Sequence, residues 1–122
     1  MAVIRPFECV RPQAEKAERV AALPYDVYNR EEACREVARE PLSFLKIDRA
    51  ETQFDSSVDT YAPEVYAKAK ELLENAIADG TFIKDSEQAY YIYELTMDGR
   101  VQTGLVACAS IDDYESNVIK KP

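Results

Sequence analysis

Two β-rich runs flank Asp98-Gly99, and they form the clearest pattern in the chain. Asp-Gly between such runs is typical of a type I′ hairpin turn, which needs positive φ at both central residues. A two-residue loop predicts a register in which these residues face each other: Met97–Arg100, Leu95–Gln102, Tyr93–Gly104 and Tyr91–Val106 on one face, and Thr96–Val101, Glu94–Thr103, Ile92–Leu105 and Tyr90–Ala107 on the other. The pairs far from the turn are largely apolar, so we expect that half to be covered on both faces.

Two segments have the apolar spacing of amphipathic helices. From Ala62 to Asp79, apolar residues recur at i, i+3 and i+4, with Pro63 suited to the first turn and Gly80 to the C′ position. The second segment, residues 29–39, opens on Asn29 as a predicted N-cap, with a capping-box glutamate three residues later. We therefore expect two main helices.

Shorter patterns predict the remaining elements. Residues 2–10 alternate weakly and favour an edge strand, Leu42 to Ile47 favours another strand, and Phe82-Ile83 leads into the hairpin. Asp48 to Thr60 is polar and acidic, which indicates a loop. Together these patterns predict one α+β domain over residues 1–122: a mixed sheet of about four or five strands led by the hairpin, with both helices packed against it.

The charge balance restricts the partners. The chain has 15 Lys and Arg against 23 Asp and Glu, for a formal net charge of −8. An acidic surface repels phosphate backbones, so we expect no general nucleic-acid binding, although a single basic pocket for one nucleotide stays open. We expect no membrane span, because no apolar run approaches the required length. Residues 1–5 lack the apolar core of a signal peptide, so we expect the cytoplasm.

Several kinds of catalytic and binding site are excluded because the residues that they need are absent from the sequence or already have structural roles. The absence of histidine excludes Ser-His-Asp and Cys-His nucleophile systems and, in practice, the usual Cys/His zinc site. Each of the three glycines has a structural role, so none is left for a phosphate-binding glycine-rich loop. The three cysteines are odd in number and far apart, which indicates thiols rather than a disulfide framework.

The remaining candidate residues each allow a functional and a structural interpretation. Asp26, after Pro24-Tyr25, could line the mouth of a site or bond backbone N–H groups in a turn. Arg5 could bind an anion. The acidic residues 112–115 could hold a hard cation, but helix capping and solvated surface explain them as well. The tyrosines of the first hairpin strand could stack on a base, although sheet packing is their ordinary role.

A set of short motifs is spread over essentially the whole chain: Ile4-Arg5-Pro6-Phe7, Pro24-Tyr25-Asp26-Val27, Pro41-Leu42-Ser43-Phe44-Leu45, Tyr66 with Ala69, Tyr91-Ile92-Tyr93, Gly99-Arg100 with Gln102-Thr103-Gly104, and Asp113-Tyr114-Glu115 followed by Ile119-Lys120-Lys121. Together these motifs resemble the N-terminal part of the prokaryotic family called "domain of unknown function ten-fifteen". Members of this family are longer, so the resemblance implies an N-terminal fragment that is inactive alone.

Some family members are labelled as similar to ParB-type partition proteins, whose ParB/sulfiredoxin-like fold handles nucleotides in several lineages. By that analogy, the resemblance implies a nucleotide-binding protein, with ligand-binding residues Arg5, Pro24, Tyr25, Asp26 and Ser43. No catalytic residue, metal or other cofactor is assigned, and whether the chain is an enzyme stays open. The alternative is a non-catalytic interaction or oligomerisation module. We also expect a homodimer through the surface left by the missing C-terminal part.

Overall fold

The structure is a computed structural model that describes residues 1–120. The chain divides into two compact units: unit 1 joins Met1–Val10 to the segment that starts at Lys84, and unit 2 comprises Arg11–Ile83. The expectation that the chain is a single domain and a fragment of a longer protein stays a prediction. Lys121, the last residue of the motif set, lies outside the described residues.

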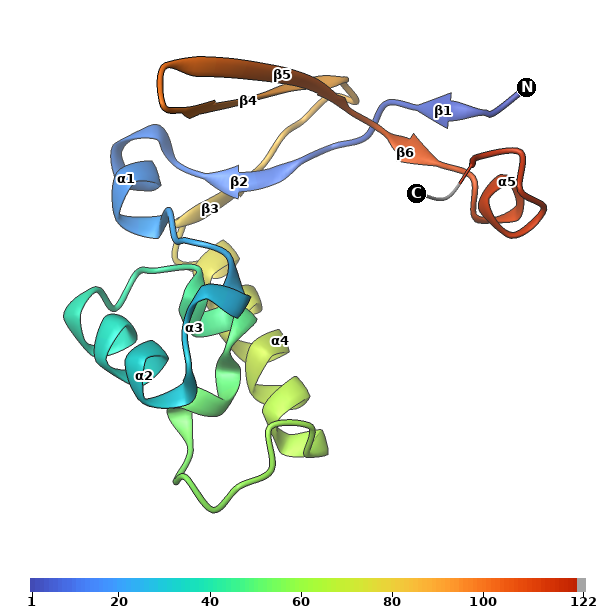
Figure 1. Cartoon of the computed structure of the whole chain (residues 1–122). Helices are drawn as coiled ribbons and strands as arrows, with labels where there is room; N and C mark the ends of the chain where they lie inside the picture. Colours follow the sequence, from blue (N-terminus) through green and yellow to red (C-terminus); the bar gives the residue numbers. More distant parts are fainter. Residues whose placement is uncertain (121–122) are drawn as a thin grey trace. The chain divides into compact units, whose positions relative to one another are not determined.

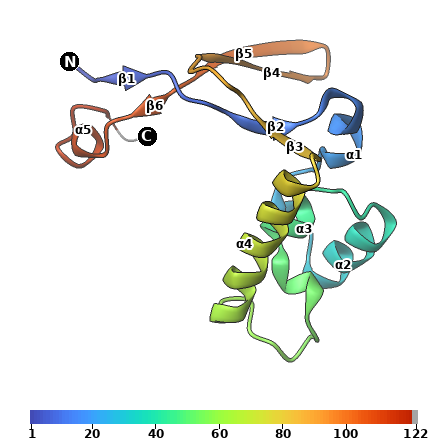
Figure 2. The same ribbon diagram turned by 180° about the vertical axis from the view of Figure 1, so that it is seen from behind.

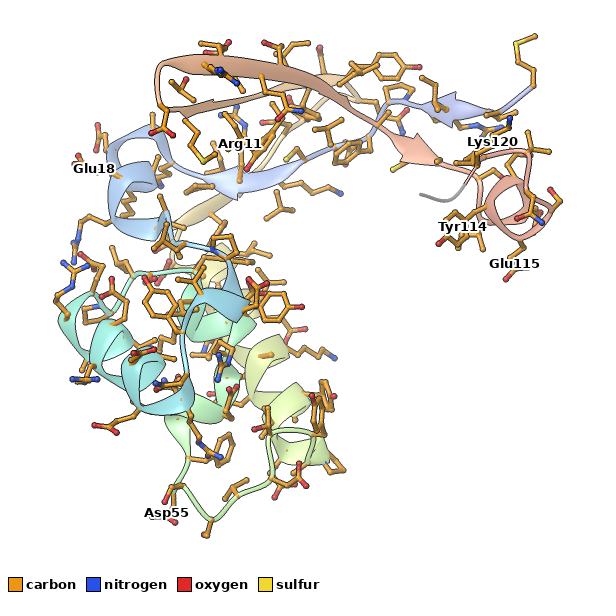
Figure 3. The ribbon with its side chains drawn as sticks, in the orientation of Figure 1. Arg11, Glu18, Asp55, Tyr114, Glu115 and Lys120 are labelled. Carbon is orange, nitrogen blue, oxygen red and sulfur yellow. The ribbon has the colours of Figure 1, made fainter. Side chains whose placement is uncertain are left out.

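Unit 1 is built on antiparallel strand pairs. Its elements are β1 (Ile4–Arg5), β4 (Tyr91–Met97), β5 (Arg100–Val106), β6 (Cys108–Ala109) and the short helix α5 (Ile111–Glu115). β1 pairs with β6, and β4 pairs with β5. Figure 3 labels Tyr114 and Glu115 on α5, which begins after Ser110, whose side chain caps the helix by accepting from the Asp113 N–H.

The hairpin has the predicted register. The ladder runs from Met97–Arg100 to Tyr91–Val106 through every pair expected in between, and Tyr90–Ala107 lies beyond its end. Asp98 and Gly99 have φ values of 51° and 74°, as a type I′ turn requires. The expected cover over its distal half is wrong, however, because Ile92 and Leu105 remain 69% and 59% exposed.

Tyr91 connects the hairpin to the N-terminal segment of unit 1. Its hydroxyl lies 2.7 Å from Asp85 Oδ2 and accepts a hydrogen bond of 2.9 Å from the Cys9 N–H. Its ring lies 5.1 Å from that of Phe7, which forms a β-bridge with Ala89. Burial and the neighbouring Asp85 raise the pKa of the Tyr91 phenol.

Unit 2 is mainly helical. Its elements are η1 (Ala14–Lys16), α1 (Ala17–Val20), η2 (Tyr25–Val27), α2 (Arg30–Arg39), α3 (Leu45–Asp48), η3 (Ala50–Gln53) and α4 (Pro63–Ala78), and the short strands β2 (Val10–Pro12) and β3 (Phe82–Lys84) pair where the chain passes between the units. Figures 1 and 2 show α4 lying alongside α3 from both sides, and the two helices are in contact. This unit holds the cavity described below.

Both long helices begin and end close to the predicted residues. Asn29 and Glu32 form a capping box at the start of α2, with each side chain bonded to the other residue's N–H at 2.9 Å. Pro63 occupies the first turn of α4, and Gly80 follows its C-cap with φ 78°. These ends agree with prediction because capping is a local property of the chain.

The predicted sheet is wrong. Over residues 1–120, the strands form three separate two-stranded sheets instead of one sheet of four or five strands. Within unit 2, α2 and α4 contact α3 and η3, and the hairpin belongs to unit 1. The apolar stripe of α4 therefore covers other helices, with Val65 only 5% exposed.

The predicted strand from Leu42 to Ile47 is a turn followed by α3. Leu45 is 1% exposed and packs with Ala33 and Val37 of α2 in the core of unit 2. The alternation of apolar residues over so short a run does not separate a strand from a buried helical turn. Since no neighbouring strand pairs with this segment, the helical turn satisfies its backbone groups internally, as in the Arg49 N–H donating to the Leu45 carbonyl at 2.7 Å.

Candidate functional site

A cavity of about 440 Å³ lies among the helices of unit 2. That size suits a small molecule. Four segments that are distant in the sequence line it: Tyr25-Asp26 of η2, Ile47 to Glu51 of α3 and η3, Thr60-Tyr61, and Val65, Tyr66 and Ala69 of α4. The cavity thus depends on the packing of α3, η3 and α4, which are in mutual contact.

An ion pair between Arg49 and Glu51 forms one wall of the cavity. The Glu51 side chain is 2% exposed and the Arg49 side chain 16% exposed, so the pair is largely removed from water. Arg49 Nη1 also donates to the backbone carbonyls of Tyr25, at 3.0 Å, and Tyr28, at 2.8 Å. A single guanidinium therefore connects the buried carboxylate to the segment that carries Tyr25 and Asp26.

A second arginine holds the loop between η3 and α4. Arg30 of α2 donates to the carbonyl oxygens of Val58 at 2.8 Å, Asp55 at 2.9 Å and Glu51 at 3.3 Å. Figure 3 shows Asp55 at the far end of this loop, which continues into Tyr61 at the cavity. The fork of donors on the guanidinium satisfies three loop carbonyls at once, and this defines the path of the chain toward the cavity.

The cavity is rich in aromatic and acidic residues. Tyr25, Tyr61 and Tyr66 line it while remaining 58%, 78% and 60% exposed. Its acidic residues beside Glu51 are Asp26 and Asp48, both exposed. Since Arg49 is the cation lining the cavity among the described residues, and it is already paired with Glu51, the cavity carries a net negative charge.

The structure brings together only part of the predicted ligand-binding set. Tyr25 and Asp26 line the cavity, and Pro24 precedes them as the N-cap residue of η2. Ser43 is 4% exposed and lines a separate hollow beside the end of α4. Arg5 belongs to unit 1, where it lies on β1 opposite Cys108. Within unit 2, Ser43 therefore lines a different hollow from Tyr25 and Asp26, and the role of all five residues in ligand binding stays a prediction.

Reasoning from the sequence missed most of the cavity. Arg49, Asp48 and Tyr61 fall in or beside the segment expected to be a plain polar loop, and Tyr66 was assigned to the core-facing stripe of the α4 helix. The only available signal was the inclusion of Pro24–Val27 and of Tyr66 with Ala69 in the motif set. The structure shows that residues from these two motifs face the same cavity.

The acidic residues 112–115 of unit 1 do not form a metal centre. Asp113 Oδ2 accepts a hydrogen bond of 2.8 Å from the Val3 N–H. Over residues 1–120, no group of three or more potential metal ligands comes together. The Asp113 carboxylate thus binds a backbone N–H of the N-terminal segment, whereas Ser110 caps α5.

Comparison with known proteins identifies the family. The family described as "Protein of unknown function (DUF1015)" matches residues 4–122, and the chain belongs to this family. No curated protein and no solved structure matches the chain. Within residues 1–120, no helix has the length and apolar character needed to cross a membrane.

Proposed function

We propose that unit 2 is a small-molecule-binding module whose ligand occupies the cavity at Tyr25, Asp26 and Tyr66. The observation that carries this proposal is the convergence of four sequence segments on one hollow of suitable volume, with aromatic residues at its opening. The side chains of Arg49 and Arg30 support the proposal further, because they hold the backbone on two sides of the cavity. Preorganised walls lower the entropic cost of binding.

A nucleotide is the ligand class that the ParB-like analogy favours, and it stays a prediction. Base stacking on exposed tyrosines supports it, because such stacking accepts any base. The charges supply no support for binding the phosphates, because Arg49 is already engaged with Glu51. Calorimetric titration of the chain with ATP and CTP, each with magnesium, tests this class. The absence of a binding heat for both nucleotides would contradict the prediction that the ligand is a nucleotide.

A pair of substitutions on α4 tests the cavity itself. Ala69 lines the cavity, whereas Ala67 is exposed on the same helix. Ala69→Phe should fill the cavity and abolish binding of fragments found by a thermal-shift screen, while Ala67→Phe should leave their binding unchanged. Circular dichroism of both variants checks that the fold is retained. Fragment binding that survives Ala69→Phe would contradict the proposal.

A second candidate function is association through the hairpin, for which the exposed faces of β4 and β5 provide specific support. Ile92, Tyr93 and Leu105 are each more than half exposed, and within the described chain β4 and β5 pair only with each other. Open strand edges beside apolar faces favour pairing with a second copy of the chain. We propose a homodimer on this basis. Sedimentation of a purely monomeric species at high concentration would contradict it.

A further inference from the structure

We propose that the cavity of unit 2 recognises an organic cation, with an ammonium or guanidinium group placed between the carboxylates and the tyrosines. This inference rests on the proposed small-molecule site and specifies the class of its ligand. It depends on the cavity as a whole: its volume of about 440 Å³, its tyrosines and its charge. Each of these three properties restricts the ligand separately.

The charge of the cavity determines the sign of the ligand. Among the residues that line it, Asp26, Asp48 and Glu51 face a single cation, Arg49, whose ion pair balances Glu51. Over the described chain, the side-chain carboxylates of these two aspartates form neither a hydrogen bond nor an ion pair. Two carboxylates without partners attract a cation and repel a phosphate or carboxylate.

The tyrosines determine that the cation is organic. The faces of aromatic rings attract ammonium and guanidinium groups through the ring quadrupole, and rings grouped around a pocket are a known way to bind such ligands. Tyr25, Tyr61 and Tyr66 line the cavity, each more than half exposed. A bare metal ion fits less well, because within residues 1–120 no cluster of three metal-ligating side chains is present.

The position of Arg49 makes this charge pattern stable. Its Nε donates to Glu51 and its Nη1 donates to the carbonyls of Tyr25 and Tyr28, so these donors are taken up by the protein's own groups. An anionic ligand that drew Arg49 away would leave a carboxylate that is 2% exposed without its cation, and an unpaired buried charge is costly. The arginine therefore serves the wall of the cavity, and Asp26 and Asp48 are left for the ligand.

Fluorine NMR of the whole chain labelled with 3-fluorotyrosine provides a site-resolved test, because the sequence has eight tyrosines and no tryptophan. Tyr→Phe variants assign the three cavity signals. Four probes are titrated: choline, its neutral isostere 3,3-dimethyl-1-butanol, butylguanidine, and ATP. We expect choline and butylguanidine to shift the signals of Tyr25, Tyr61 and Tyr66 and to bind roughly tenfold more tightly than the neutral isostere.

Matched variants separate the contributions of charge and ring. The double variant Asp26→Asn, Asp48→Asn should bind choline about tenfold more weakly. Glu74→Gln, which changes an exposed carboxylate elsewhere on α4, should leave the choline affinity unchanged. Tyr61→Ala should lower the choline affinity by about threefold, and Tyr61→Phe should retain this affinity because the ring is kept. Tyr61 is 78% exposed, so neither change threatens the fold.

The outcomes distinguish the two levels of the proposal. If the neutral isostere or ATP shifts the cavity signals at least as strongly as choline, the cation preference is wrong while the small-molecule site stands. If no probe and no screened fragment shifts them, both are wrong. A choline affinity that does not change in the Asp26→Asn, Asp48→Asn double variant would also overturn the cation assignment.

Discussion

Glu51 and Arg49 form an ion pair at the wall of the cavity, and the glutamate side chain is 2% exposed. Two residues apart on the chain, they lie at the junction of α3 and η3. The pair connects the small core of unit 2 to the proposed ligand site, because the same guanidinium holds the Tyr25 carbonyl. Stability and binding should therefore depend on the same residues.

Arg49→Met should destabilise the protein strongly. It leaves the Glu51 carboxylate buried without its cation, and breaking such pairs typically costs about 3–5 kcal/mol. The exposed Arg39–Glu36 pair of α2 offers the control, since Arg39→Met should change stability little. Urea unfolding followed by circular dichroism measures both. Equal effects of the two variants would show that the Arg49 pair has no special role.

Arg30→Lys should loosen the loop between η3 and α4. Lysine keeps the charge but cannot reproduce the fork of donors that reaches the carbonyls of Glu51, Asp55 and Val58. We expect faster hydrogen exchange over residues 52–61, by about tenfold for a loss of about 1.4 kcal/mol in local opening. Arg35→Lys, exposed on the same helix, is the control. Unchanged hydrogen exchange over residues 52–61 in Arg30→Lys would contradict the inference that Arg30 holds this loop in place.

Tyr91 should titrate above its ordinary range. Burial and the hydrogen bond to Asp85 raise its pKa above the reference value of 10.0, so the folded state favours the protonated phenol. Its stabilising contribution is complete below pH about 10 and is lost as the pH rises through the folded pKa. Tyr91→Phe should lower Tm at pH 7, and the difference should shrink at strongly alkaline pH.

Ultraviolet absorbance of tyrosinate gives the direct measurement of the Tyr91 pKa. The difference between the titrations of the native chain and of Tyr91→Phe isolates this phenol, with Tyr93→Phe on the exposed hairpin as the control. A midpoint for Tyr91 below 10.0 would contradict the assigned hydrogen bond with Asp85.

Substitution of each of the three glycines by alanine should distinguish the loss of stability that comes from backbone strain from the loss that comes from steric crowding. Gly80 and Gly99 both have positive φ, but a Cβ would lie 3.1 Å from Gln13 Nε2 at Gly80 and meet nothing within 4 Å at Gly99. Gly99→Ala should cost about 1 kcal/mol from φ alone, and Gly80→Ala should cost more. Gly104→Ala, with ordinary φ and a contact of 3.9 Å, should be near neutral. Chemical denaturation of the three variants gives the order, and a reversal of Gly80 and Gly99 would contradict it.

The elements that the sequence predicted correctly depend on neighbouring residues. Asp98 and Gly99 have the positive φ that their residue types favour, and this turn sets the hairpin register through Tyr91–Val106. Asn29, Pro63 and Gly80 likewise mark helix ends through local backbone chemistry. The family assignment also followed from the sequence, because its motifs are short and linear.

Which surfaces these elements pack against could be determined only from the tertiary structure. Leu42 to Ile47 has strand-like alternation, yet the burial of Leu45 against Ala33 and Val37 makes it the start of a helix. The stripe on α4 predicts a buried face but does not identify its partners, which within unit 2 are α3 and η3. Amphipathic spacing specifies that a face is buried without specifying what it is buried against.

The candidate site shows the same division. The sequence alone singled out Tyr25 and Asp26, whose turn is a local feature, and it also identified the family and the net acidity of the chain. Only the tertiary structure brought Arg49, Tyr61 and Tyr66 to that turn and placed Ser43 at a different hollow. A cavity is formed by contacts between segments that are distant in the sequence. These contacts follow from tertiary packing, so local sequence patterns do not predict them.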